Sequence, residues 1–477
     1  MKSKILFPAG ILVTLGVVYG RTLAPGLSWA NGGADGGDLI TAAFVNGVPH
    51  PTGYPLYLLF AKMFFFLPIG NLAYRTNLLS AFCTILASLL IFITLDRLLV
   101  GQKYAKLASS ISALAFGLSP LVWSQAVITE VYGLQSLLTI GILYQALFFG
   151  KKTSEDFLRG LLFGLALGNH ITTILLLPIL FWERNTIHSA SKAHIFIRLF
   201  GLLLGSMVYI ILPLNARNNP VINWINPVTL KSFIQLVSGQ IYQSYFSLSY
   251  VIEHTLAWAR LLNEQFGIQG LVIGIFAIID SKNRNGYSFP IAWIFISYGV
   301  FALIYASYDS YVYLIPTVLA FSLWIGLGFN TLITSIMERW QKAMWIIAPV
   351  IIVLFVWHTT FVAPVVDASK DNRAELFCQS VSDSVPKDAI IFTKDDNSTF
   401  SLWYFQFVED KRVDTSIIAE GLLRYDWYRQ SIRNTYPNLE IPELSNLSLF
   451  DLIMKNSIRP YCIVEYQEEA KINCFQF

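Results

Sequence analysis

Long apolar blocks recur along the sequence and limit what the chain can fold into. The stretches 78–95, 196–214 and 343–362 are each long enough to cross a bilayer whose hydrocarbon core is about 30 Å thick. Apolar residues make up 55% of the chain and charged residues only 13%, whereas a soluble protein of this length needs considerably more charge. We therefore expect a mainly α, multi-pass integral membrane protein.

The placement of Lys and Arg predicts how the spans are oriented. Cytoplasmic loops of membrane proteins carry more Lys and Arg than outer loops. From an inner N-terminus, whose apolar run is read as an uncleaved first helix, about eleven crossings leave long outer loops at 25–75 and 214–266. The net charge of +3 is spread among short loops, so nothing indicates nucleic acid as a partner. In a prokaryote the chain would lie in the plasma membrane, with its active site and C-terminal segment extracytoplasmic.

The stretch 157–182 allows two topologies. Read as one long span, it would invert every later loop and place several basic residues outside. Gly168, Asn169 and His170 interrupt it, however, and a broken backbone at membrane depth survives only inside protein or against a cavity. We favour two short helices in a hairpin whose tip carries His170 to the outer side.

The composition changes after residue 365. The segment 1–365 is expected to form the transmembrane module. The segment 366–477 is charged and mixed, with a strand at 389–393 and a helix at 425–435, which indicates a small extracytoplasmic α/β domain. Three of the four cysteines lie in this tail and allow at most one disulfide among themselves. No Cys or His cluster has the spacing of a zinc site, so a structural metal is not expected.

Two carboxylates lie three residues apart in the first outer loop. Asp35 and Asp38 stand beside several glycines, which let a backbone approach a ligand closely. Asp38 also precedes an apolar run, so it can simply cap a short helix at 39–45, and Asp35 can be an ordinary turn residue. Spacing alone therefore leaves both a catalytic and a structural role open for the pair.

Further candidate residues are predicted on the same side of the membrane. They come from a proline-rich turn, the start of a span, the hairpin tip and the second long loop, and they are His50, Tyr54, Glu130, Tyr132, His170 and Arg217. Several have structural alternatives, because His50 can be satisfied within its turn, Glu130 can cap a helix and Arg217 can mark the interface. The apolar stretch 56–67 is short for a span and predicts an interfacial helix, along which Lys62 reaches toward water.

Patterns typical of several other protein classes are missing from the sequence. There is no GxxxxGK[ST], HExxH or GxSxG motif and no GxGxxG after a strand, so nucleotide binding and those hydrolase mechanisms are unsupported. A transporter, such as a flippase of lipid-linked sugars, would carry polar residues at mid-membrane and internal repeats, whereas the polar groups here gather in loops. A sensor or scaffold would leave the acidic glycine loop unexplained. An enzyme is favoured, with a transporter as the alternative.

Two neighbouring motifs resemble a known family. Residues 33–43 (GADGGDLITAA) and 48–57 (VPHPTGYPLY) are similar to the signature of GT-C-type membrane glycosyltransferases related to animal plexin-type protein O-mannosyltransferases. The resemblance extends to Glu130-Val131-Tyr132, Gly168-Asn169-His170, Arg217 with Asn223-Trp224-Ile225-Asn226-Pro227, Asp395-Asp396-Asn397-Ser398-Thr399-Phe400 and Tyr425-Asp426-Trp427-Tyr428. One departure is Asp38, where the family usually has Glu.

The resemblance implies a GT-C fold and a sugar transfer. A polyprenyl-phosphate-linked donor would pass its sugar to an extracytoplasmic acceptor hydroxyl, with inversion at the anomeric carbon. Asp35 is implied as the catalytic base and Asp38, with its shorter side chain, as a supporting residue. The six residues from His50 to Arg217 named above would bind the donor or its phosphate. The family's sugar is mannose. The acceptor can be protein, glycan or lipid. The resemblance implies no definite cofactor, and a divalent cation is one option.

Overall fold

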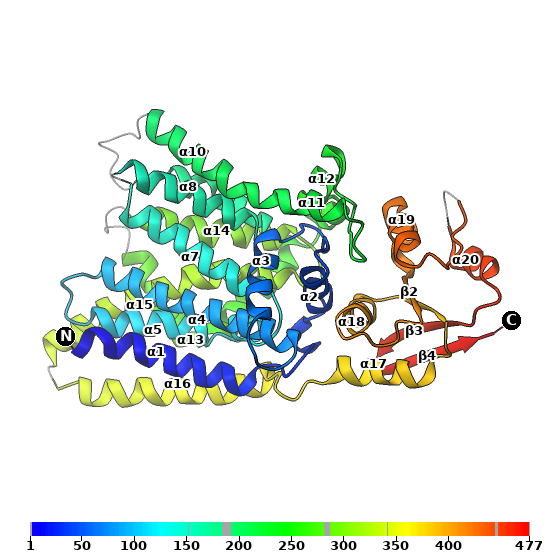
Figure 1. Cartoon of the computed structure of the whole chain (residues 1–477). Coiled ribbons are helices and arrows are strands. Elements are labelled where there is room, and N and C mark those ends of the chain that lie inside the picture. The colour runs from blue at the N-terminus through cyan, green and yellow to red at the C-terminus, as the bar shows by residue number, and fades with distance from the viewer. Residues whose placement is uncertain are drawn as a thin grey trace.

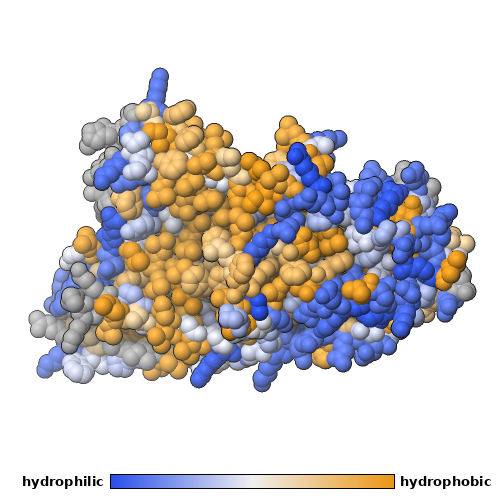
Figure 2. All heavy atoms as spheres, in the orientation of Figure 1, coloured by the Kyte–Doolittle hydropathy of each residue, from blue (hydrophilic) through white to orange (hydrophobic). Residues whose placement is uncertain are grey.

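The chain forms a helical bundle that carries a smaller α/β unit at one end (Figure 1). Apolar side chains cover much of the visible face of the bundle, whereas polar side chains dominate the α/β unit (Figure 2). A helical membrane protein with a water-exposed domain presents this division. The computed structural model describes residues 2–150, 152–183, 192–280, 287–340, 342–443 and 447–476.

Helices of very different length build the bundle. Its α-helices, in chain order, are α1 (Lys2–Thr22), α2 (Gly36–Phe44), α3 (Pro55–Phe65), α4 (Leu72–Leu98), α5 (Ala105–Gly117), α6 (Pro120–Ala126), α7 (Tyr132–Phe148), α8 (Thr153–Leu167), α9 (Leu177–Phe181), α10 (Lys192–Ser206), α11 (Ile211–Ala216), α12 (Leu230–Val237), α13 (Val251–Asp280), α14 (Ser288–Ile304), α15 (Ile315–Arg339) and α16 (Met344–Val366). Short 3-10 helices join them, namely η1 (Ala30–Gly32), η2 (Ile171–Leu176), η3 (Met207–Ile210), η4 (Gln240–Tyr245) and η6 (Ser310–Leu314).

Local sequence sets several helix ends. Asn71 caps α4, because its side-chain oxygen accepts a hydrogen bond from the backbone N–H of Tyr74 at 2.8 Å. Prolines stand in the first turn of α3, α6, α9 and α15, where a missing N–H costs no helical hydrogen bond. The predicted interfacial helix at 56–67 appears as α3, and Lys62 on it donates a hydrogen bond to Asn46.

The number of membrane crossings differs from the sequence-based expectation. Among the described residues, 6 helices are long and apolar enough to span, or up to 7 if α5 and α6, which meet at 65°, form one broken span. The eleven expected crossings are therefore not established. The difference arises because apolar stretches that were counted as spans form shorter helices, such as Tyr132–Phe148 and Ser288–Ile304.

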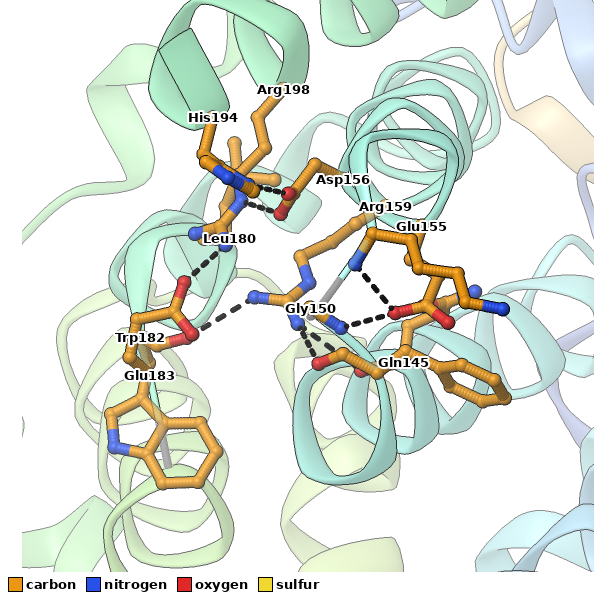
Figure 3. A network of polar contacts seen from close by, with 12 residues as sticks. Gln145, Gly150, Glu155, Asp156, Arg159, Leu180, Trp182, Glu183, His194 and Arg198 are labelled. Atoms are coloured by element: carbon orange, nitrogen blue, oxygen red, sulfur yellow. Dashed lines mark hydrogen bonds and ion pairs between the residues drawn. The ribbon is translucent and has the colours of Figure 1, made fainter. Parts of the chain in front are cut away.

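The predicted hairpin at 157–182 is confirmed. The backbone breaks after α8, and η2 and α9 run back along it, so that the guanidinium of Arg159 donates to the carbonyl oxygen of Trp182 at 3.1 Å (Figure 3). The same guanidinium also donates to the carbonyl of Phe149 at 2.6 Å, which ties the end of α7 to the hairpin base. His170 lies at the tip, between α8 and η2.

Glycines and a buried ionic network hold α8 against α10. A Cβ atom at Gly164 would overlap the carbonyl oxygen of Leu202, and Gly160, Gly201 and Gly205 are similarly blocked, so the two backbones are in contact. At the beginnings of these helices, Asp156 accepts a hydrogen bond from Arg198 Nε at 2.6 Å, and His194 and Glu183 complete the network (Figure 3). Breaking such a buried pair by removing one partner is costly, because the other charge stays buried.

The α/β unit follows α16. Its elements are α17 (Arg373–Ser384), β1 (Ile390–Thr393), α18 (Asp396–Phe407), β2 (Ser416–Ala419), η7 (Glu420–Leu422), α19 (Asp426–Thr435), α20 (Leu449–Lys455), β3 (Tyr461–Gln467) and β4 (Glu469–Phe475). The sheet order is β2-β1-β3-β4, with β1 parallel to both neighbours and β4 antiparallel to β3. The strand expected at 389–393 is the fully buried β1, and the helix expected at 425–435 is α19. A disulfide joins Cys462 to Cys474 across β3 and β4.

Candidate active site

The acidic first loop leads directly into helix α2. The helix begins at Gly36, so Asp35 occupies the N-cap position and Asp38 lies within the first turn. The expectation of a helix at 39–45 capped by Asp38 is therefore wrong by one turn. Gly37, in the first turn of this helix, faces α18 of the α/β unit, where a Cβ atom would overlap the carbonyl oxygen of Phe400. Only glycine permits this close approach.

Asp38 is completely buried and accepts three hydrogen bonds. Its Oδ2 atom accepts from the backbone N–H of His50 at 2.9 Å and pairs with His50 Nδ1 at 2.7 Å. Its Oδ1 atom accepts from the indole N–H of Trp224 at 3.1 Å. A buried carboxylate held by three donors is satisfied and immobile. Asp38 thus fixes the ring of His50 and ties the first outer loop to the second.

His50 bridges the two aspartates. With Nδ1 directed to Asp38, its Nε2 atom lies 3.4 Å from Asp35 Oδ2. Burial alone would lower the pKa of His50, but the charge of Asp35 and the hydrogen bond and charge of Asp38 outweigh burial and raise this pKa to about 9. The ring is therefore an imidazolium near neutral pH, with a hydrogen on each nitrogen.

Asp35 is the aspartate that a ligand can reach. Its side chain is 40% exposed, against 0% for Asp38, and it lines a cavity of about 540 Å³. Burial raises the pKa of Asp35 and the neighbouring charges of Asp309 and Asp38 raise it further, while the charge of His50 opposes them. A carboxylate with a raised pKa is a stronger base than an ordinary aspartate.

The cavity gathers most of the residues that the sequence singled out. Its lining includes Asp35, His50, Tyr54, Glu130, Tyr132 and His170. Asp38 stands behind His50, outside the lining. Arg217 is exposed at the end of α11 and is also outside it, so the structure does not bring this predicted phosphate ligand to the cavity.

His170 contributes a neutral donor to this lining. Its Nδ1 atom accepts a hydrogen bond from the backbone N–H of Thr172 at 3.2 Å, which leaves the ring hydrogen on Nε2. The rings of Tyr54, Tyr132 and Tyr313 surround the imidazole at centroid distances of 5.9, 6.0 and 5.7 Å. Together they form an aromatic wall with hydroxyl groups, a surface suited to the mixed apolar and polar faces of a sugar.

Glu130 adds another carboxyl group to the cavity. The residue is 5% exposed and precedes Val131, the N-cap of α7. Ser80 on α4 holds the backbone of Glu130 through both the N–H, at 3.2 Å, and the carbonyl, at 3.1 Å. Burial, followed by the nearby charge of Asp35, raises the pKa of Glu130 well above its usual range. A raised pKa favours the neutral carboxyl form, which can donate a hydrogen bond to a ligand.

Sequence reasoning did not select several polar residues of the lining as site residues. Tyr242, Asp309, Tyr313 and Asp396 reach the cavity from the second long loop, the segment before α15 and the α/β unit. Only Asp396 lay in a stretch that had been singled out, through the family resemblance. In the described part of the chain, no group of three or more His, Cys, Asp or Glu side chains is arranged to hold a metal ion.

Comparisons with known proteins agree with this architecture. Residues 35–192 match the family described as the protein O-mannosyl-transferase TMEM260 N-terminal domain, and residues 374–471 match TMEM260-associated domain 2. The mouse protein O-mannosyl-transferase TMEM260 is 25% identical over 91% of this chain, and its Dictyostelium discoideum counterpart is 22% identical over 92%. The chain spans 65% and 60% of the lengths of these two relatives.

Solved structures share the fold at low sequence identity. ArnT from Cupriavidus metallidurans, crystallised with undecaprenyl phosphate, superimposes with a TM-score of 0.62 at 11% identity, covering 97% of this chain and 94% of ArnT. The Archaeoglobus fulgidus oligosaccharyltransferase in its apo form gives a TM-score of 0.51 at 10% identity, covering 98% of this chain and 74% of that enzyme. The chain is thus a membrane protein of the GT-C fold, related to the animal TMEM260 protein O-mannosyl-transferases.

Proposed function

We propose that this protein transfers a sugar from a polyprenyl-phosphate donor to a hydroxyl group of an extracytoplasmic protein, and that the sugar is mannose. The observation that carries the proposal is the reachable carboxylate of Asp35, held beside the cationic ring of His50 in a cavity next to the apolar bundle. The two relatives, both protein O-mannosyl-transferases by name, support the reaction and its protein acceptor. The lipid phosphate bound to ArnT supports the class of donor.

The proposed chemistry is a single displacement. Asp35 takes the proton of the acceptor hydroxyl as the oxygen attacks the anomeric carbon. The new C–O bond forms on the face opposite the bond that breaks, and the polyprenyl phosphate leaves with the electron pair, so the anomeric configuration inverts. Asp38 does not touch the reacting atoms in this scheme. It positions His50 and keeps it charged.

Charge that develops on the departing phosphate needs a stabilising group. The cavity lining within the described chain contains no Lys or Arg, which leaves the imidazolium of His50 as its cationic side chain. The hydroxyl group of Tyr132 and the Nε2 hydrogen of His170 supply neutral donors, whereas the hydroxyl of Tyr54 donates to the carbonyl oxygen of Pro51 at 3.2 Å. Arg217 has no part in this scheme, because it lies outside the cavity lining.

We place the cavity and the segment 366–477 on the outer side of the membrane. The disulfide between Cys462 and Cys474 supports this orientation, because disulfides persist in oxidising compartments and are rare in the cytosol. We likewise propose that residues 1–365 act as the transmembrane module and that the α/β unit closes the cavity from outside.

The proposal is tested with the purified chain in lipid nanodiscs, given labelled polyprenyl-phosphate mannose and a peptide containing Ser and Thr. We expect labelled peptide and free polyprenyl phosphate in equal amounts, with the inverted anomer in the product. A peptide with every Ser and Thr replaced by Ala is the control and should stay unlabelled. Movement of the donor across vesicle membranes without any transfer would instead identify a flippase and overturn the proposal.

A further inference from the structure

The α/β unit reaches into the cavity through the first turn of α18. Asp395, Asp396 and Asn397 at the start of this helix all line the cavity, together with residues of the bundle. The segment 374–471, which matches a separate family domain, therefore supplies part of the wall around Asp35.

Helix α18 is firmly docked on the first outer loop. Gly37 of α2 packs directly on the backbone of Phe400, and the ring of Phe400 stacks on that of His50 with centroids 6.3 Å apart. The indole N–H of Trp29 donates to Ser401 Oγ at 2.8 Å. These contacts fix the start of α18 relative to Asp35 and His50, so its side chains have defined positions in the cavity.

The two aspartates at the start of α18 have different surroundings. Asp395 is engaged as the helix cap, because its carboxylate accepts from the backbone N–H of Ser398 at 2.8 Å and from its hydroxyl at 2.7 Å. In the described part of the chain, the carboxylate of Asp396 has neither a hydrogen-bond partner nor an ion-pair partner, although it lines the cavity near Asp35 and His50. It is therefore available to a ligand.

The position of Asp396 indicates which ligand it meets. Figure 1 shows α18 on the side of α2 that faces away from the long helices, and the apolar surface in Figure 2 covers those helices and not the α/β unit. A lipid-linked donor enters from the apolar side, because its chain stays in the membrane. Two carboxylates that line one cavity also repel a phosphate, whereas they attract N–H and O–H donors.

We propose that Asp396 binds the acceptor polypeptide and positions its hydroxyl group for Asp35. Its carboxylate accepts a hydrogen bond from an N–H of the acceptor segment, while the neighbouring Ser or Thr side chain faces Asp35 across the cavity. The inference rests on the proposed transfer to protein. It makes the α/β unit the part of the molecule that selects the acceptor.

The test compares Asp396→Asn with wild type and with Asp383→Asn, in the nanodisc transfer assay with a Ser/Thr peptide. Asp383 is an exposed carboxylate at the end of α17, outside the cavity, so its replacement is a matched control. We expect Asp396→Asn to raise the KM for peptide by roughly 5-fold, because the amide oxygen of Asn still accepts a hydrogen bond but without the charge that strengthens it. The KM for donor and the slow hydrolysis of donor without peptide should not change.

An unchanged KM for peptide, or an equal loss of donor hydrolysis, would overturn the role of Asp396 while leaving sugar transfer intact. Absence of transfer in wild type and in Asp383→Asn would instead overturn the proposed function itself. Asp396→Glu keeps the charge and should restore part of the peptide affinity. Failure of that rescue, with a melting temperature equal to that of wild type, would also count against acceptor binding.

Discussion

At the scale of residues, His50 determines what the two loop aspartates can do. It separates a completely buried Asp38, which is occupied by three donors, from an accessible Asp35 that lines the cavity. The same ring gives Asp35 a cationic neighbour, whose charge opposes the rise in the pKa of Asp35. This difference between the aspartates follows from the loop's fold and not from their spacing of three.

The raised pKa of His50 predicts a specific pH dependence. Its value of about 9 lies above the usual 6.5, so the imidazolium is present at neutral pH and is lost as the pH rises through about 9. The transfer rate of wild type should fall over that range. His50→Gln should lower the neutral rate by roughly 10- to 100-fold and abolish the alkaline decline, because glutamine carries no charge to lose. Transfer rates measured from about pH 6 to about pH 10 check this, provided that the protein remains folded over that range.

A control histidine separates this effect from general destabilisation. His254 on α13 contacts the carbonyl of Leu303 through Nδ1 at 3.0 Å and does not line the cavity. His254→Gln should keep the alkaline decline.

The pKa of His50 also affects the folding stability of the protein. Because this pKa is raised on folding, His50 contributes stability that is fully present below about pH 6.5 and is lost as the pH rises through about 9. An alkaline decline that survives in His50→Gln would show that another group titrates.

Much of the residue-scale site could be predicted. Asp35, His50, Glu130 and His170 were grouped because the topology placed their loops on one membrane face, and all four line the cavity. Arg217 was grouped by the same argument but is exposed outside the cavity, since a membrane face is far wider than one site. Asp309 and Asp396 depend on how distant segments pack, which the local sequence does not encode.

At the scale of elements, the contact between α8 and α10 carries the hairpin that presents His170. The two helices meet through glycines at a spacing of four, and side-chain volume at these positions would separate them. The sequence showed the break at Gly168 and so predicted the hairpin. It did not reveal the number of crossings, because an apolar stretch has the same composition whether it forms one span or a shorter buried helix.

Enlarging one of these glycines should therefore destabilise the protein. In Gly164→Val the new side chain would overlap the carbonyl oxygen of Leu202, and overpacking of this kind costs about 1–3 kcal/mol. We expect a lower melting temperature in detergent and reduced transfer. Gly16→Val is the matched control, because no atom lies within 4 Å of a Cβ at Gly16 of α1. Equal melting temperatures for the two variants would refute the proposed helix contact.

At the scale of the whole molecule, the α/β unit is a structural part of the site and not an appendage. Its helix α18 packs on α2, and its disulfide joins the neighbouring strands β3 and β4. The sequence predicted the unit from its composition, together with one strand and one helix. Its docking could not be predicted, because the contact between Gly37 and Phe400 joins residues far apart in the chain.

The disulfide gives a direct test of orientation. If the α/β unit is extracytoplasmic, Cys462 and Cys474 should resist a maleimide reagent in intact membranes until a reductant is added. A double Cys462→Ser and Cys474→Ser variant should show no reductant-dependent labelling, since Cys83 and Cys378 are buried. Full labelling of wild type without reductant would place the unit in a reducing compartment and contradict the proposed topology.

The central claim is that the Asp35 carboxylate accepts the proton of the attacking hydroxyl. The most direct test is the single-turnover rate of sugar transfer by Asp35→Asn at saturating donor and peptide, beside Asp383→Asn as control. We predict a loss of about 1000-fold, within the range that removal of a general base causes, with donor binding and melting temperature unchanged. A rate for Asp35→Asn close to that of the control would contradict the assignment of Asp35 as the base.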